Sequence, residues 1–141
     1  MKFWDTSAVV PLLVPSARTE AAVRRVREDP AMVVWWGTST ECVSACARLE
    51  REGRLTADGM AQALGRLHAV AEHWIEVPAS AAVREQATRA LRLHPLRAAD
   101  ALQLGAAIVA ADHSPATMEF VTNDERLSLA AAKEGFVIKP G

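Results

Sequence analysis

Short, dense runs of apolar residues alternate along the chain with longer segments in which apolar positions recur every three or four residues. The short runs are rich in valine, isoleucine and aromatic residues and are bounded by proline, glycine or charged residues, which is typical of buried β-strands. They predict strands at Phe3–Trp4, Met32–Trp36, Trp74–Val77, Met118–Thr122 and Phe136–Ile138.

The segments between these runs have the spacing of helices. They are the apolar segment Ala8–Val14, then Ala17–Glu28, Thr38–Glu52, Thr56 to about His73, Ser80–Leu93, Arg97–Ala111 and Asn123–Lys133. Pro30 and the glycines Gly53 and Gly135 supply stop signals at three of their ends. Strands that alternate with helices predict an α/β sandwich in which helices flank a mostly parallel central sheet.

The composition fits a single folded domain that covers residues 1–141. Half of the residues are hydrophobic, which excludes a disordered chain, and no repeat or linker divides the sequence. Charged residues interrupt every apolar segment, so no run approaches the roughly 20 apolar residues of a membrane span. Lys2 leads directly into the segment around Asp5 without a long apolar signal sequence, and we therefore expect a cytoplasmic protein with no membrane partner.

The formal net charge of −1 gives no overall positive field of the kind that attracts nucleic acids. The cationic side chains are nevertheless mostly arginines, which can bind phosphate groups through two hydrogen bonds. Their more common role is to form a solvated helix face. We expect pairing in neighbouring turns with Glu20, Glu28, Glu50, Glu52 and Glu85.

The helical spacing of Thr38–Glu52 predicts that Val43, Cys46 and Leu49 face inward. Cys42 and Cys46 lie four positions apart in this segment. A structural zinc site usually needs four ligands, and no second pair of cysteines or histidines has the required spacing. We therefore expect both cysteines to be small buried apolar residues. The four scattered histidines are expected at the surface or in local hydrogen bonds.

Three acidic residues begin helices and have a purely structural interpretation. Asp5, in KFWDTSAVV, and Asp124, in FVTNDERL, each follow a strand, where a carboxylate can cap a helix by accepting a backbone N–H. Glu41, in GTSTECVSA, stands three residues after Thr38, which is the spacing of a capping box. Thr6 or Ser7 could also provide the cap in place of Asp5.

Asp100 is harder to explain by structure alone. Between residues 98 and 111 only Asp100 and Gln103 are polar, so this helix should be buried on most sides. A carboxylate on the same face as Leu104 is costly unless a partner or a metal ion compensates its charge. The positive end of the helix explains an acid in the first turn, but less well one on an apolar face.

Taken together, the four acids indicate a functional site. In a parallel sheet the carboxyl ends of the strands share one edge, where ligands usually bind, and all four acids are expected near that edge. Converging carboxylates repel one another, and hard divalent cations such as Mg²⁺ or Mn²⁺ relieve this repulsion. Such a site can activate water and neutralise charge on a phosphate, so the expected reaction is phosphodiester hydrolysis.

Four stretches of the chain resemble the PIN-domain family, and within it the small VapC-type toxins of bacterial toxin–antitoxin pairs. They are FWDTSAVV with Asp5, STECVSA with Glu41, LRAADALQLGAA with Asp100 and FVTNDERL with Asp124. They occur in the family's order over nearly the whole chain, and the last two are the most specific. The resemblance implies a PIN-like three-layer sandwich and an endoribonuclease activity that depends on Mg²⁺ or Mn²⁺.

The resemblance also implies roles for the acids. Asp5 and Asp100 are the expected metal ligands, Asp124 completes the acidic cluster, and Glu41 binds the metal directly or through water. One of these carboxylates, or the metal, would activate the attacking water.

Hydroxyl groups near these acids are further candidates. Thr6, Ser7 and Thr122 are placed to orient water or phosphate, whereas Asn123 lies where the family pattern varies and receives no role.

The partners implied by the resemblance are an RNA substrate, a second copy of the chain and a small VapB-type antitoxin. Such an antitoxin covers the acidic groove and often inserts a basic side chain near the metal. Trp35 and Trp36 can stack on bases, although a core or dimer role is expected for at least one of them.

Two other readings compete with a ribonuclease. A receiver-like signalling domain also has an α/β sandwich with an acidic Mg²⁺ pocket, but it needs an acidic pair after the first strand and an acceptor aspartate after a middle strand. The chain has only Asp5 at the first place and no aspartate directly after Trp36 or Val77. A PIN-like module that only binds RNA or a partner is the second alternative, and the full set of acids argues against it.

Overall fold

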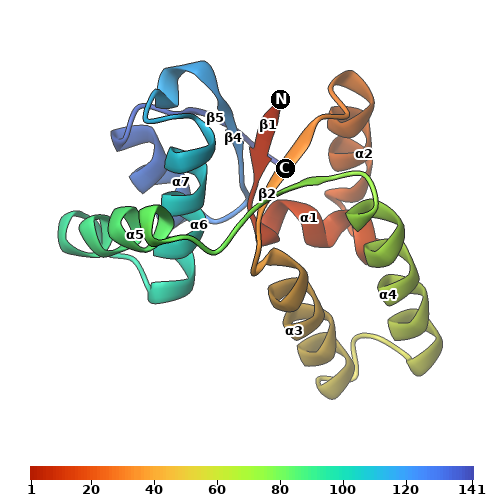
Figure 1. Cartoon of the computed structure of the whole chain (residues 1–141). Coiled ribbons are helices and arrows are strands. Elements are labelled where there is room, and N and C mark those ends of the chain that lie inside the picture. Colours follow the sequence, from red (N-terminus) through yellow and green to blue (C-terminus); the bar gives the residue numbers. More distant parts are fainter.

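The computed structural model describes all 141 residues and contains one five-stranded sheet (Figure 1). The strands are β1 (Lys2–Trp4), β2 (Met32–Trp35), β3 (Ile75–Val77), β4 (Glu119–Val121) and β5 (Val137–Lys139). Their order across the sheet is β3-β2-β1-β4-β5, and every neighbouring pair is parallel. All predicted strands are present, and the sheet is parallel throughout.

Seven α-helices connect the strands. They are α1 (Thr6–Leu13), α2 (Thr19–Glu28), α3 (Thr38–Arg51), α4 (Ala57–Ala71), α5 (Ala81–Leu93), α6 (Ala98–Ala110) and α7 (Glu125–Lys133), and a short 3-10 helix, η1 (Pro115–Thr117), precedes β4. The predicted helix ends agree with these to within two residues. Gly53 follows α3 with a φ of 72°, as the predicted glycine stop requires.

Side chains on the strands alternate between the two faces of the sheet, and each face has its own core. Phe3 and Phe120 lie in a core shared with α5, α6 and α7. Trp4 and Val121 point to the opposite face, into a core formed with α1, α2, α3 and α4. Helices therefore cover both faces of the sheet (Figure 1), which confirms the predicted three-layer α/β sandwich.

The chain changes direction across the sheet at β1. From β1 it proceeds to β2 and β3 on one side, and it then crosses to β4 and β5 on the other side. In open α/β sheets, the crevice at the carboxyl ends of the strands beside such a reversal is the usual place for a ligand. Trp4 is paired with Val121 in the β1–β4 ladder, so the residues that follow, Asp5 and Thr122, leave the sheet side by side.

One helix face differs from its prediction. Cys42 and Cys46 are free and buried, as expected, but Val43, which the spacing placed inside, is 37% exposed. Cys42 precedes Val43 by one position, which is about 100° of helix rotation, and it occupies the inward side of α3 instead. The predicted inward position of Leu49 is only half-buried.

The predicted arginine pairing is correct in part. Arg24 pairs with Glu20 and Arg54 with Glu52, both at exposed positions. The other three predicted acceptors, Glu28, Glu50 and Glu85, have no ion pair, so that part of the prediction is wrong. None of the helices has both the length and the apolar character that crossing a membrane would require.

Candidate active site

A cleft of about 350 Å³ lies at the carboxyl edge of the sheet and contains all four acids singled out from the sequence. Its walls come from α1, α3, α6 and the start of α7. The lining residues are Asp5, Thr6, Ser7, Val10, Pro11, Glu41, Ala45, Asp100, Gln103 and Asp124. Four distant stretches of the chain thus converge on one hollow.

Asp5 is the most deeply buried of the four acids, with 3% of its surface exposed. Its Oδ1 accepts the backbone N–H of Ala8 at 3.1 Å, so Asp5 is itself the N-cap of α1. The hydroxyl of Ser7 lies 2.8 and 2.9 Å from its two oxygens, and the hydroxyl of Thr122 donates to Oδ2 at 3.0 Å. The idea that Thr6 or Ser7 replaces Asp5 as the cap is therefore wrong.

Burial raises the pKa of Asp5 from 3.8 to about 7, because the charged form loses its contact with water. The hydrogen bonds from Ser7, Thr122 and Ala8 oppose this shift, and the negative charge of Asp124 adds to it. Asp5 thus combines a local capping role with an energetically unfavourable charge at neutral pH.

Glu41 does not form the capping box that its spacing predicts. Thr38 is already the first residue of α3, the N-cap is Gly37, and no side chain caps this end. The Oε2 of Glu41 instead accepts the hydroxyl of Thr6 at 2.8 Å and the side-chain amide of Gln103 at 2.6 Å. Burial raises the pKa of Glu41, and the charge of Asp100 adds to the increase against these hydrogen bonds.

Asp100 lies half-buried in the first turn of α6, where the otherwise buried helix opens onto the cleft. Burial raises its pKa, and the charge of Asp124 raises it further. The charges of Arg97 and Arg126 act in the opposite direction but do not cancel the shift. The carboxylate is therefore in the unfavourable setting that the sequence predicts.

Asp124 is the N-cap of α7, because its Oδ1 accepts the backbone N–H of Leu127 at 2.7 Å. Its own backbone N–H donates to the hydroxyl oxygen of Thr122 at 3.0 Å. Thr122 therefore connects two acids of the cleft: it donates to Asp5 and accepts from Asp124.

Sequence reasoning gave no role to two residues that hold the cleft together. Gln103 was noticeable as the second polar residue of an apolar helix, and its amide contacts Thr6, Thr38 and Glu41. The backbone N–H of Asn123 donates to the Ser7 hydroxyl at 2.8 Å, and its side-chain amide donates to the Ser7 carbonyl at 3.1 Å. No local signal distinguishes Asn123, because Ser7, its partner in the cleft, is 116 positions away.

The side chains of the cleft have the chemistry that a hard divalent cation requires. Every charged group that lines the cleft is a carboxylate, whose oxygens are the ligands that such a cation prefers. No lysine or arginine forms an ion pair with any of the four acids. No three acids, histidines or cysteines are already arranged to hold one ion together. Mg²⁺ commonly keeps several waters and uses only one or two carboxylates, and the cleft fits binding of that partly hydrated kind.

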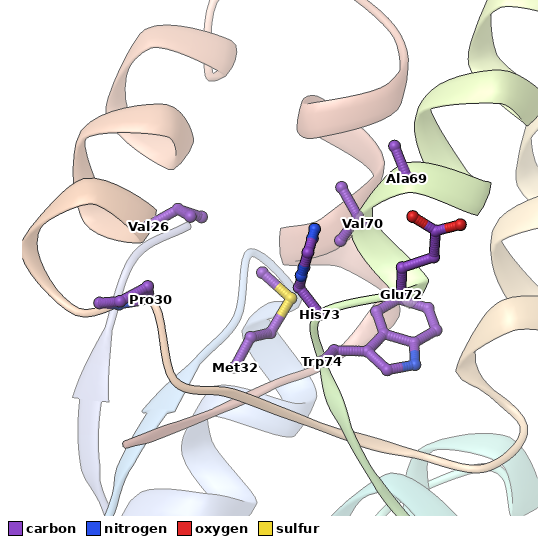
Figure 2. A pocket seen from close by; sticks show the side chains of 8 residues that line it. All are labelled: Val26, Pro30, Met32, Ala69, Val70, Glu72, His73 and Trp74. Carbon is purple, nitrogen blue, oxygen red and sulfur yellow. The ribbon is translucent and has the colours of Figure 1, made fainter.

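A second pocket has a different character. Figure 2 shows it between α2 and α4, with a volume of about 280 Å³. Val26, Met32 and Val70 line it, and Glu72 is its only carboxylate. Because Met32 begins β2, this pocket lies at the amino end of that strand, away from the edge that carries the acidic cleft.

Comparisons with known proteins give the fold and leave the activity open. No protein-family model matches the chain, and no curated protein matches it either. Among solved structures, the chain is similar to the crystal structure of PAE2754 from Pyrobaculum aerophilum, with 19% identity and a TM-score of 0.66 over 97% of this chain and 87% of that one. It is also similar to FitAcB from Neisseria gonorrhoeae, with 17% identity and a TM-score of 0.65 over 98% of this chain and 96% of that one.

The fold is PIN-like. The similarity extends over nearly the full length of both solved structures, so the fold expected from the four sequence stretches is confirmed. At identities below a fifth, this similarity concerns the arrangement of the backbone and not the chemistry of the cleft.

Proposed function

We propose that the chain is a metal-dependent endoribonuclease that hydrolyses RNA phosphodiester bonds, and that it is the toxin of a type II toxin–antitoxin pair. One observation carries the nuclease proposal: four carboxylates from distant parts of the chain line one cleft at the reversal point of a PIN-like sheet, and none forms an ion pair with a cation of the protein. Buried structural acids are normally paired, so unpaired acids in this cleft indicate a ligand of positive charge.

Mg²⁺ or Mn²⁺, when bound, would act as a Lewis acid on the phosphate and lower the pKa of the attacking water. Asp5 and Asp100 would hold the ion, with Asp124 beside them and Glu41 contacting it directly or through water. A carboxylate of this group would accept the proton of the water as its oxygen attacks phosphorus. Thr6, Ser7 and Thr122 donate to, or lie against, these carboxylates, so their first task is to orient the acids.

The RNA strand would meet an exposed aromatic ring at the same edge of the sheet as the cleft. Trp36 follows β2 at the carboxyl edge of the sheet and is 60% exposed, and its ring lies edge-on against that of Trp35. Trp35 is buried in the core, so only Trp36 is available to stack on a base.

The protein partners belong to the same proposal. A small VapB-type antitoxin would cover the acidic cleft and neutralise it with a basic side chain, and two copies of the chain would form a homodimer. The support for both is the resemblance of the four acidic stretches to VapC-type toxins.

The receiver-like alternative is disfavoured by the order of the strands. Receiver domains have the order 2-1-3-4-5, whereas this sheet has the order 3-2-1-4-5. A PIN-like module that only binds RNA or a partner remains the competing function, and turnover is what separates it from a nuclease.

The test compares wild type with Asp5→Asn and Asp100→Asn on RNAs of mixed sequence, with Mg²⁺, Mn²⁺ or chelator. We expect cleavage by wild type to require the metal and to fall at least about 100-fold in either variant, since each removes a charge from the ion's binding site. Asp58→Asn is the matched control, because Asp58 is exposed in α4 and does not line the cleft.

Thermal unfolding provides a second measurement. Mn²⁺ should stabilise wild type and Asp58→Asn but not Asp5→Asn, because a ligand stabilises only the state that binds it. Equal cleavage by all four proteins, unaffected by chelator, would contradict the proposal. Metal binding without cleavage of any RNA would favour the non-catalytic module.

A further inference from the structure

Gln103 is a buried polar side chain in the wall of the acidic cleft. It lies one turn after Asp100 on α6, and only 2% of its surface is exposed. Its Nε2 lies 2.6 Å from Oε2 of Glu41 and 3.0 Å from the hydroxyl oxygens of both Thr6 and Thr38. One amide group therefore connects α6 to α1 and α3, the two helices that carry its partners.

The contact with Glu41 fills one oxygen of that carboxylate. Oε2 receives the amide of Gln103 at 2.6 Å and the hydroxyl of Thr6 at 2.8 Å, whereas Oε1 has no hydrogen bond within the protein. A carboxylate oxygen has about two lone-pair sites, so both sites of Oε2 are occupied. Only Oε1 is left for a ligand in the cleft.

Gln103 is poorly explained by stability. The rest of the buried surface of α6 is apolar, and the Oε1 of Gln103 is itself buried without a hydrogen-bond partner. An unpaired buried carbonyl costs free energy that a methionine or leucine at this position would avoid. A residue that breaks the local pattern in this way needs a compensating role, and the contact with Glu41 is the one that the structure offers.

We propose that Gln103 is a positioning residue that restricts Glu41 to binding a cation through one oxygen, and so adapts the cleft to a small octahedral ion. The inference rests on the proposed metal-dependent function. Mg²⁺ requires near-ideal octahedral geometry, whereas Ca²⁺ also accepts carboxylates through both oxygens in larger, more flexible shells. Releasing Oε2 would therefore favour Ca²⁺ over Mg²⁺.

Direct calorimetric titration with Mg²⁺ and with Ca²⁺ tests this without relying on activity. In Gln103→Met, Mg²⁺ affinity should fall about tenfold, the size expected when an outer partner of a metal ligand is removed, and Ca²⁺ affinity should stay equal or rise. Thr38→Val is the matched control, because Thr38 contacts the same amide but not the carboxylate. It should change both affinities by less than about threefold, since the contact of Gln103 with Glu41 remains.

A second variant approaches the same oxygen from another helix. Thr6→Val removes the other donor to Oε2 and leaves α6 intact, so it should shift selectivity in the same direction by a smaller factor. In a Glu41→Gln background, Gln103→Met should have no further effect on selectivity, because residues that act through one group are not additive.

The outcomes separate this inference from the proposed function. If wild type binds Mg²⁺ and cleaves RNA, but Gln103→Met and Thr6→Val both weaken Mg²⁺ and Ca²⁺ equally or leave both unchanged, only the role of Gln103 is wrong. The same holds if Gln103→Met has its full effect without Glu41. If wild type binds neither ion and cleaves no RNA, the proposed function fails and the role of Gln103 with it.

Discussion

Two carboxylates of this chain, Glu134 and Asp5, have opposite surroundings. Glu134, at the end of α7, accepts a hydrogen bond from Arg89 at 2.9 Å, and its other oxygen lies 2.9 Å from Nε2 of His94. Asp5, in the cleft, receives only hydroxyl and backbone N–H donors and has no cationic partner. The first acid ties the end of α7 to α5, while the second has no cationic partner beside the sheet when it is ionised.

The pKa values of Glu134 and Asp5 are shifted in opposite directions. Burial acts to raise the pKa of Glu134, but the hydrogen bonds and charges of Arg89 and His94 lower it below its usual value. Burial raises the pKa of Asp5 to about 7, and hydroxyl donors do not offset it. A charge kept at a cost to stability is typical of sites selected for function, whereas a paired charge contributes to the fold.

The largest expected effect concerns Asp5 and pH. The folded protein keeps the Asp5 proton up to about pH 7, whereas the unfolded chain releases it near 3.8, so the folded state binds more protons between these values and stability falls as pH rises. In chelator, we expect the unfolding free energy of wild type to drop by about 2–3 kcal/mol more than that of Asp5→Asn between about pH 5 and about pH 8.

Urea unfolding at the two pH values measures this difference. Asparagine is as good an N-cap as aspartate, so the variant keeps the capping bond to Ala8 while losing the buried charge. Asp58→Asn, at an exposed position, should follow wild type. An Asp5→Asn protein that is less stable than wild type at the higher pH would contradict the claim that the buried charge of Asp5 costs stability.

The opposite sign is expected at Glu134. Its pKa is lowered, so its contribution to stability is present above its unfolded pKa and is lost as pH falls. Glu134→Gln should lower the unfolding free energy near neutral pH by about 1–2 kcal/mol, because the bonds to Arg89 and His94 weaken.

Glu72→Gln is the control for this variant. Glu72 also pairs with a histidine, His68, but both side chains are mostly exposed, so little change is expected. If the two glutamine variants have equal unfolding free energies in urea, the ion pairs of Glu134 contribute no more to stability than the exposed pair of Glu72.

The smallest expected effect tests the hydroxyl donors of the cleft. Thr122→Val preserves shape but removes a hydrogen bond to Asp5, so the pKa of Asp5 should rise further. We expect a loss of up to about 1 kcal/mol near pH 8 in chelator, measured by urea unfolding. In the Asp5→Asn background the pH-dependent part of this loss should disappear, and its persistence would show that Thr122 acts elsewhere.

Much of the fold was predictable because local chemistry and tertiary structure agree. The dense apolar runs at β2 and β4 are strands, and Thr56 and Ser80 are N-caps of α4 and α5 by their side-chain oxygens. The four acids could be brought together in advance only by assuming a parallel sheet, which places successive strand ends at one edge.

The wrong capping-box prediction and the unpredicted roles of Asn123 and Gln103 have a common physical origin. The Thr38 and Glu41 pair has the local spacing of a capping box, but Glu41 finds donors on α1 and α6 instead of its own helix. Asn123 and Gln103 likewise act through residues far away in sequence. Spacing describes contacts within one element, and these contacts exist only after several elements have packed.

The pairing of β1 with β4 also has a consequence for the synthesis of the protein. The hydrogen bond from Thr122 to Asp5 joins residues 117 positions apart, and β4 and Asp124 leave the ribosome long after β1. A nascent chain that has exposed only its first hundred residues therefore lacks one wall of the acidic cleft. For an enzyme proposed to cut RNA, this arrangement would delay activity until most of the chain has emerged.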